Sequence, residues 1–124
     1  MSSHKQFDHE KLKVYQLAIS FVSHAESIRE GLPKSLAVSG QLDRASISIP
    51  LNIAEGNGKF TSADRCRYFD IARGSALESA ACLDVLVAKK LMESHAVEGG
   101  KEMLVNIVSM LVGLIRANSD TRSV

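Results

Sequence analysis

Apolar residues recur along the chain at the spacing of amphipathic helices. The first stripe has steps of three and four residues and consists of Val14, Leu17, Phe21, Ala25 and Ile28. Side chains at this spacing lie on one face of a helix. The pattern therefore predicts a first helix over about 9–30, which Gly31 and Pro33 bring to an end.

Three more segments show helical patterns between stop signals. A second helix is predicted over about 34–56, because two glycines around an asparagine follow it. A third is predicted over about 61–92, with Thr61 or Ser62 as its N-terminal cap. A fourth is predicted over about 94–118, and its middle is apolar on nearly all sides, so it needs cover on most sides.

Pro50 lies inside the second predicted helix. Proline removes the backbone hydrogen bond to the carbonyl of Ser46 and disfavours helical geometry at the residue before it. We expect a kinked helix here. The alternative is a break at Pro50 followed by a new helix.

Short links between four helices favour an all-α fold, an antiparallel up-down-up-down four-helix bundle, with residues 1–124 as a single domain. Composition agrees, because aromatic residues make up only 5 % and the core must be built from aliphatic side chains and alanine. The longest apolar stretch, 103–115, is shorter than the roughly 20 residues of a membrane span. With a polar N-terminus that lacks a signal peptide, we expect a cytoplasmic protein without membrane contact.

Charge gives little support to a dedicated nucleic-acid binder. The net charge is +1, from 15 basic and 14 acidic residues, whereas such proteins usually carry a clear basic excess. RNA or DNA binding stays open if basic residues gather on one side of an assembled particle. The candidates for such contacts are Lys11, Lys13, Lys59, Arg65, Arg67, Lys89 and Lys90.

A polar stripe on the second predicted helix is flanked by apolar residues on both sides. We call it the polar seam. On this helix it comprises Gln41, Arg44, Ser48, Asn52 and Glu55, and Ser75 and Glu78 of the third helix extend it. Solvent is expected on the remaining arc, which comprises Asp43, Ser46, Pro50 and Asn57. Gly74, in mid-helix, predicts a closely approaching neighbouring backbone.

The seam has two interpretations. It is a buried network that fixes helix register or a subunit contact, or it is a catalytic or ligand-binding site. If the two helices meet here, Arg44 is expected to pair with Glu78 or Glu55, while the serines and Asn52 share hydrogen bonds. We favour the structural interpretation, because the stripe contains no histidine and no pair of carboxylates on one face. No enzymatic activity, cofactor or small-molecule ligand is predicted.

Histidine and cysteine give no metal-binding pattern. A di-metal bundle site needs Glu-x-x-His sets, and no glutamate here has a histidine three residues later. We expect solvated side chains for the four histidines, which are His4, His9, His24 and His95. Cys66 and Cys82 match no zinc or redox spacing and are expected to be packed as reduced thiols.

The Gly-Asn-Gly-Lys sequence at 56–59 superficially resembles a phosphate-binding loop. Such a loop needs a glycine where Ile53 stands, a hydroxyl where Phe60 stands, and a preceding strand. We reject that interpretation. An anion site at the start of the third helix, near Lys59, Arg65 and Arg67, is a weaker alternative, and a solvated basic turn is favoured over it.

One long segment resembles a known family. The string QLDRASISIPLNIAEGNGKFTSADRCRYFDIARGSALE, from Gln41 to Glu78, is preceded by LKVYQLA and by Leu-Pro at 32–33. It is similar to the bacterial four-helix-bundle proteins first noticed as open reading frames inside intervening sequences of large-subunit ribosomal RNA genes. The matching positions are Gln41, Arg44, Ala45, Ser48, Ile49, Pro50, Asn52, Ile53, Ala54, Glu55, Gly56, Ala72, Gly74, Ser75 and Glu78. Tyr15 stands where many members have tryptophan.

The resemblance implies a four-helix bundle that assembles into a ring-shaped homopentamer. A related branch serves as accessory proteins of diversity-generating retroelements, where a strongly basic pentamer is thought to bind nucleic acid. The resemblance implies a non-enzymatic oligomeric scaffold or interaction protein, associated with RNA or with nucleic-acid-handling machinery. A ring that binds RNA or DNA directly is the alternative, followed by an enzyme that uses Arg44, Glu55 and Glu78.

Overall fold

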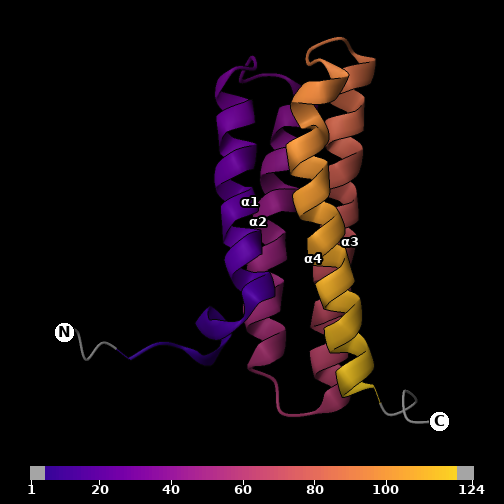
Figure 1. Cartoon of the computed structure of the whole chain (residues 1–124). Helices are drawn as coiled ribbons and strands as arrows, with labels where there is room; N and C mark the ends of the chain where they lie inside the picture. The colour runs from indigo at the N-terminus through magenta and orange to yellow at the C-terminus, as the bar shows by residue number, and fades with distance from the viewer. Residues whose placement is uncertain (1–4, 120–124) are drawn as a thin grey trace.

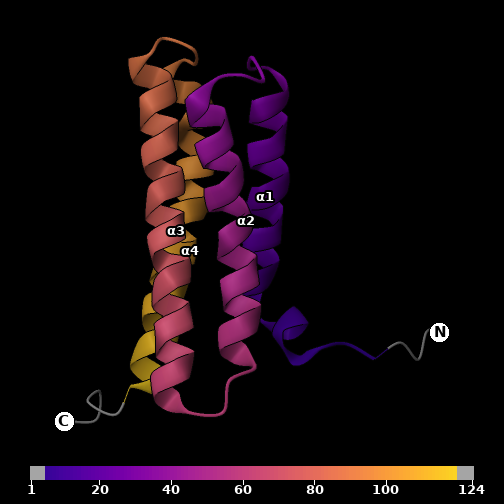
Figure 2. The same ribbon diagram turned by 180° about the vertical axis from the view of Figure 1, so that it is seen from behind.

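The computed structural model describes residues 5–119. Its four long helices are α1 (Lys13–Glu30), α2 (Ala37–Asn57), α3 (Ser62–Ala88) and α4 (Glu98–Asn118), and two short 3-10 helices, η1 (Asp8–Lys11) and η2 (Ser94–Val97), precede α1 and α4. The described residues contain no strand. Figures 1 and 2 show the helices running up and down in turn, which confirms the predicted all-α four-helix bundle.

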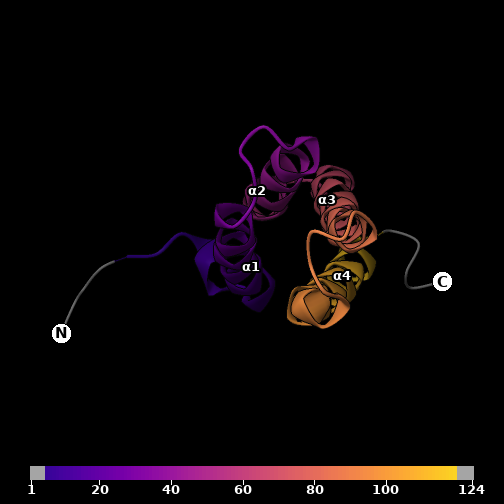
Figure 3. The same ribbon diagram turned by 90° about the horizontal axis from the view of Figure 1, so that it is seen from above.

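Each helix packs against the helices next to it in the chain. Seen from above, α1, α2, α3 and α4 follow one another around the bundle (Figure 3). The contact between α2 and α3 is the most extensive, and the contact between α1 and α4 is the least extensive among the four neighbouring pairs of long helices. α2 is therefore covered along both flanks, by α1 and by α3.

The core lies along the axis of the bundle and is mainly aliphatic. Its largest fully buried apolar side chains are Phe21, Phe69, Leu42, Ile49, Ile53, Leu83, Leu86, Leu104, Ile107 and Leu111. The stripe predicted for the first helix is confirmed, since all its members are buried except Leu17, which is partly buried. Burial of such side chains contributes roughly 1.5–3 kcal/mol each and is the main source of stability.

The helix ends differ from the predicted ones by several residues. Leu12 is extended (φ −77°, ψ 128°) and separates η1 from α1. α2 begins at Ala37 rather than near 34. α3 ends at Ala88 rather than near 92, because Lys90 adopts a positive φ of 62° that no helix continues. The predicted start of the fourth helix, at Ser94, is the 3-10 turn η2.

Two predicted local features of α2 and α3 are resolved by the structure. The Thr61 Oγ1 accepts a hydrogen bond from the Asp64 backbone N–H at 3.1 Å, which confirms Thr61 as the cap of α3. α2 continues through Pro50 as one helix (Figure 2). The alternative of a break and restart at Pro50 is therefore wrong.

The predicted solvent-facing arc of α2 is wrong. Ser46 is only 2 % exposed and Pro50 is buried. This side of α2 meets α1, where Arg29 reaches Asp43 at 3.3 Å and donates to the backbone oxygen of Ser39 at 2.9 Å. Because α1 and α3 occupy the two flanks, α2 meets solvent at the outer edge of the polar seam instead.

α4 is buried along one side only. Leu104, Ile107 and Leu111 enter the core, whereas Val105 is 66 % exposed and Met110 is also exposed. The single bundle does not supply the cover on most sides that the sequence predicted for this helix. No helix within residues 5–119 has the length and hydropathy needed to cross a membrane.

Two glycines in helices have opposite surroundings. A Cβ added to Gly56 would lie 3.0 Å from atoms of Phe69 and Tyr68. A Cβ added to Gly74 would meet no atom within 4 Å. Gly56 therefore permits the close approach of α2 and α3, whereas no backbone within residues 5–119 approaches Gly74 as the sequence predicted.

This contrast gives a paired prediction for stability. Gly56→Ala should lower the free energy of unfolding by about 1–3 kcal/mol, because the rigid Phe69 ring cannot move away cheaply. In an isolated subunit, Gly74→Ala should raise it by up to about 1 kcal/mol, because alanine favours the helix and its Cβ meets no other segment of residues 5–119. Urea denaturation monitored by circular dichroism measures both. Equal effects of the two substitutions would contradict the α2–α3 contact.

Candidate functional site

The centre of the polar seam is a hydrogen-bonded cluster between α2 and α3. The Ser75 hydroxyl donates to the Ser48 Oγ at 2.8 Å. The Asn52 Nδ2 donates to the Ser48 Oγ at 2.9 Å and to the Ser48 carbonyl at 2.8 Å. Ser75 is buried and the other two residues are partly buried. The predicted hydrogen bonds are confirmed, and they join the two helices at one register.

The charged residues at the edge of the seam lie in solvent. Gln41, Arg44, Glu55 and Glu78 are all exposed. Within residues 5–119, Arg44 makes no ion pair, and its Nη2 donates to the Gln41 Oε1 at 2.8 Å. The Glu55 carboxylate lies 3.4 Å from the Lys59 Nζ. The predicted pairing of Arg44 with Glu78 or Glu55 is therefore wrong, because water hydrates these charges and they need no buried partner.

Cys82 lies beside the seam and is 6 % exposed. Burial, and then the negative charge of Glu78, raise the pKa of the Cys82 thiol above its ordinary value of 9.0. The thiol therefore stays protonated at neutral pH, which is the opposite of what a nucleophilic cysteine needs. Cys66 is partly buried, and its sulfur lies 3.5 Å from the Ile115 carbonyl oxygen.

The histidines occupy different environments. His95 is exposed and His9 is partly buried, with its ring against Tyr15 at a centroid distance of 4.7 Å. His24 lies against Gly100, and its Nε2 is buried without a hydrogen-bond partner in the described part of the chain. The prediction of a solvated side chain is wrong for His24, and His4 lies outside the described residues. No group of three or more His, Cys, Asp or Glu side chains in the described part of the chain is arranged to hold a metal ion.

The structure separates five of the seven predicted basic residues into two groups. Lys59, Arg65 and Arg67 lie at the end of the bundle where α2 turns into α3. Lys89 and Lys90 follow α3 at the opposite end (Figure 1). Within one copy, these five residues therefore do not form one basic surface.

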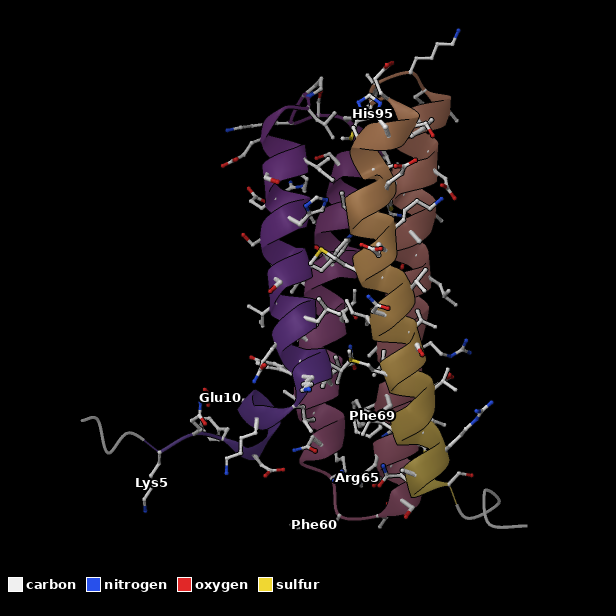
Figure 4. All side chains as sticks on the ribbon, viewed as in Figure 1. Lys5, Glu10, Phe60, Arg65, Phe69 and His95 are labelled. Atoms are coloured by element: carbon white, nitrogen blue, oxygen red, sulfur yellow. The ribbon has the colours of Figure 1, made fainter. Side chains whose placement is uncertain are left out.

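Arg65 holds the α2–α3 turn in place. Its Nη1 donates to the carbonyls of Asn57 at 2.6 Å and Lys59 at 3.2 Å. Its Nε donates to the Asn118 Oδ1 at 2.9 Å, at the end of α4. Figure 4 shows Arg65 next to the turn and near the end of α4. Most of its donors are used inside the protein, which leaves few for the nucleic-acid contact predicted for Arg65, and that contact stays a prediction.

Two aromatic residues at this turn were not among the predicted site residues. Phe60 is 102 % exposed and projects at the tip of the turn (Figure 4). The Tyr68 ring lies 5.1 Å from the Lys59 Nζ and 4.6 Å from the Arg67 Cζ. The sequence carries a signal for them, because each aromatic residue directly follows one of these basic residues. We call Lys59, Phe60, Arg67 and Tyr68 the turn cluster.

The fold and the seam define a class of small all-helical bundles whose central polar residues bond to one another. A family model described as 23S rRNA-intervening sequence protein matches residues 10–113. The chain therefore belongs to the 23S rRNA-intervening sequence protein family.

A crystal structure supports the fold. It is that of a protein of unknown function from the S23 ribosomal protein family of Bacteroides thetaiotaomicron. The two chains are 23 % identical with a TM-score of 0.78, over 82 % of this chain and 97 % of the other. A search of the curated proteins finds no match to this chain.

The hydrogen-bonded centre of the seam predicts a measurable contribution to stability. Ser75→Ala should lower the free energy of unfolding by about 1 kcal/mol, because it removes the one bond that joins the two helices within the cluster. Arg44→Ala should change it by less than about 0.5 kcal/mol, because the side chain is exposed. Urea denaturation at fixed protein concentration measures both. A larger loss with Arg44→Ala would contradict the assignment of Arg44 to the solvated edge.

The raised pKa of Cys82 predicts slow alkylation. In a Cys66→Ser variant, Cys82 should react with iodoacetamide at pH 8 far more slowly in the folded than in the urea-unfolded protein, because thiolate and access are both reduced. Folding stability from this thiol should be fully present below pH 9.0 and decline as the pH rises through its higher folded pKa. Mass spectrometry measures the labelling, and equal rates in both states would refute the burial.

Proposed function

We propose that the protein is a non-enzymatic homo-oligomeric scaffold in which the outer surface of α2 and α3 of one subunit contacts a different surface of the next subunit. The observation that supports this most is a set of large apolar side chains left exposed on both sides of the seam. Leu51 is 62 % exposed and Ile71 is 43 % exposed, and Ile47 lies exposed one turn from Leu51. Exposed apolar patches of this kind mark contact surfaces. We call Ile47, Leu51 and Ile71, with the seam between them, the outer α2/α3 face.

Gly74 supports a close contact at the same face. Glycine in mid-helix costs up to about 1 kcal/mol relative to alanine. Within residues 5–119 of one subunit, no other segment uses the space that its missing side chain leaves. A neighbouring subunit packed against this part of α3 would use that space and offset the cost.

A second apolar surface supports a ring rather than a two-fold dimer. A groove of about 200 Å³ between α3 and α4 is lined by Ala76, Leu77, Ala80, Lys101, Leu104, Val105 and Val108. Cyclic rings larger than a dimer require two different surfaces that fit each other in head-to-tail fashion. The exposed Leu51 and Ile47 on one face and this groove on another supply two different apolar surfaces for such a contact. A ring of five is the arrangement that the resemblance to the family implies.

The exposed charges of the seam fit this role better than catalysis. Arg44, Glu55 and Glu78 are exposed in the seam between the apolar side chains of the outer α2/α3 face. Charges in an interface set its register and exclude wrong partners, while the apolar side chains beside them provide most of the affinity. The serines and Asn52 beneath them are already bonded within the chain.

The test compares two isoleucines of similar exposure. Ile71→Glu places a charge on the outer α2/α3 face, and Ile19→Glu places one on α1, where the isoleucine is 46 % exposed. Light scattering after size-exclusion chromatography should show a multimer for the unmodified protein and for Ile19→Glu. Ile71→Glu should shift the mass towards one subunit, because burying an unpaired charge is costly.

Three results would overturn this proposal. One is a monomeric mass for the unmodified protein at micromolar concentration. Another is an unchanged multimer for both Ile71→Glu and Leu51→Glu, with circular dichroism showing that the variants are folded. The third is loss of assembly in Ile19→Glu alone, which would place the interface on α1 instead.

A further inference from the structure

The turn between α2 and α3 presents an aromatic ring that no part of the described chain uses. Phe60 is fully exposed, although burial of a phenylalanine ring is among the larger favourable terms in folding. It lies beyond the ends of the helices, at the tip of the turn (Figure 4). The ring is therefore available to a partner that approaches the end of the bundle.

The backbone beneath Phe60 is held from several sides. Arg65 bonds to the carbonyls of Asn57 and Lys59, on the α2 side of Phe60. Thr61, on the other side, caps α3. The Asn57 Nδ2 also donates to the Asp8 Oδ2 at 3.0 Å. Binding of a partner to Phe60 therefore costs little conformational entropy of the turn, because the backbone of the turn is already fixed.

Lys59, which precedes Phe60 in the chain, and Arg67, near the start of α3, share one aromatic ring. The Lys59 Nζ and the Arg67 Cζ lie 5.1 Å and 4.6 Å from the centre of the Tyr68 ring, both within the range of cation–π attraction. Arg67 is exposed, and the side chain of Lys59 is about one third exposed. Tyr68 thus positions two groups that can contact phosphates at the same end of the bundle as the exposed Phe60 ring.

The charge balance at the turn limits the contribution of phosphate contacts. The Lys59 Nζ lies 3.4 Å from the Glu55 Oε2, and the Arg67 Nη2 lies 3.9 Å from the Asp64 Oδ1. Both carboxylates are about half exposed, so these pairs are weak and can exchange for phosphate. A partner recognised here is held mainly by ring stacking and by about two phosphate contacts.

We propose that the turn cluster binds single-stranded nucleic acid, with Phe60 stacked on a base and with Lys59 and Arg67 on the flanking phosphates. Aromatic rings beside basic side chains are the general means of binding single strands. A duplex offers no free base face along its length, so the chemistry favours an unpaired segment. One copy of the turn carries the site, and the proposal does not depend on the oligomer.

A single introduced tryptophan provides a local test. The sequence contains no tryptophan, so Phe60→Trp gives one emitter at the tip of the turn. Titration with an oligouridine RNA of about 12 nucleotides should quench its fluorescence to a plateau, because a base stacks on the indole. Phe7→Trp is the matched control, since Phe7 is a second exposed phenylalanine, 73 % exposed, on the N-terminal segment. Its emission should not change.

Affinity and salt dependence complete the test. In fluorescence anisotropy with the labelled RNA, Phe60→Ala should weaken binding at least about tenfold, as expected for the loss of one stacked base. Lys89→Gln, at the far end of the bundle, should change it by less than about twofold. The slope of log K against log salt should be about −1.4, as expected for two phosphate contacts on a single strand. Single-stranded DNA should bind within a few-fold of RNA.

The proposal fails if RNA does not bind at about 50 mM salt. That result would favour a protein as the partner of Phe60. It fails equally if Phe7→Trp is quenched as strongly as Phe60→Trp, or if a duplex binds as tightly as the single strand. Repeating the titration with a Phe60→Trp protein that also carries Ile71→Glu separates RNA binding from assembly. Quenching that persists in a monomer supports the turn cluster whatever the oligomeric state, and quenching confined to the multimer overturns a site on one copy.

Discussion

Gly56 lies against the Phe69 ring and the Cβ of Tyr68, and a Cβ of its own would stand only 3.0 Å from them. This contact lets α2 and α3 approach closely at the end where the chain reverses. Beside this contact, Phe69 is fully buried in the core. The Tyr68 ring lies against Lys59 and Arg67. Further along the same pair of helices, Ser48 and Ser75 meet. The turn cluster and the polar seam therefore both depend on how these two helices pack.

The sequence predicts the helices and the bundle well, because helical periodicity and stop signals are local properties. It also predicts the Thr61 cap and the hydrogen bonds among Ser48, Asn52 and Ser75. It does not predict which side of α2 meets solvent. A helical wheel gives the angular order of the side chains, but the flank that α1 covers depends on packing between distant segments. Ser46 and Pro50 are buried for that reason.

The site residues show the same limit more sharply. Charge alone suggested Arg65, Lys89 and Lys90 as nucleic-acid contacts, but the donors of Arg65 are used by the turn and by Asn118, and the two lysines lie at the other end. Phe60 lies in the turn and belongs to no helical periodicity. Its exposure is therefore seen only in the folded structure. The alternation of basic and aromatic residues in Lys59-Phe60 and Arg67-Tyr68 was the available signal.

Arg65 also connects parts of the chain that are far apart in sequence. Through Asn57 and Lys59 it holds the turn, and through Asn118 it holds the last turn of α4. Protein segments that share such bonds open together in local unfolding, while segments without them open independently. The end of α4 and the α2–α3 turn should therefore exchange their amide hydrogens as one cooperative unit. Fraying at the end of α4 would then loosen a loop that lies more than fifty residues earlier in the chain.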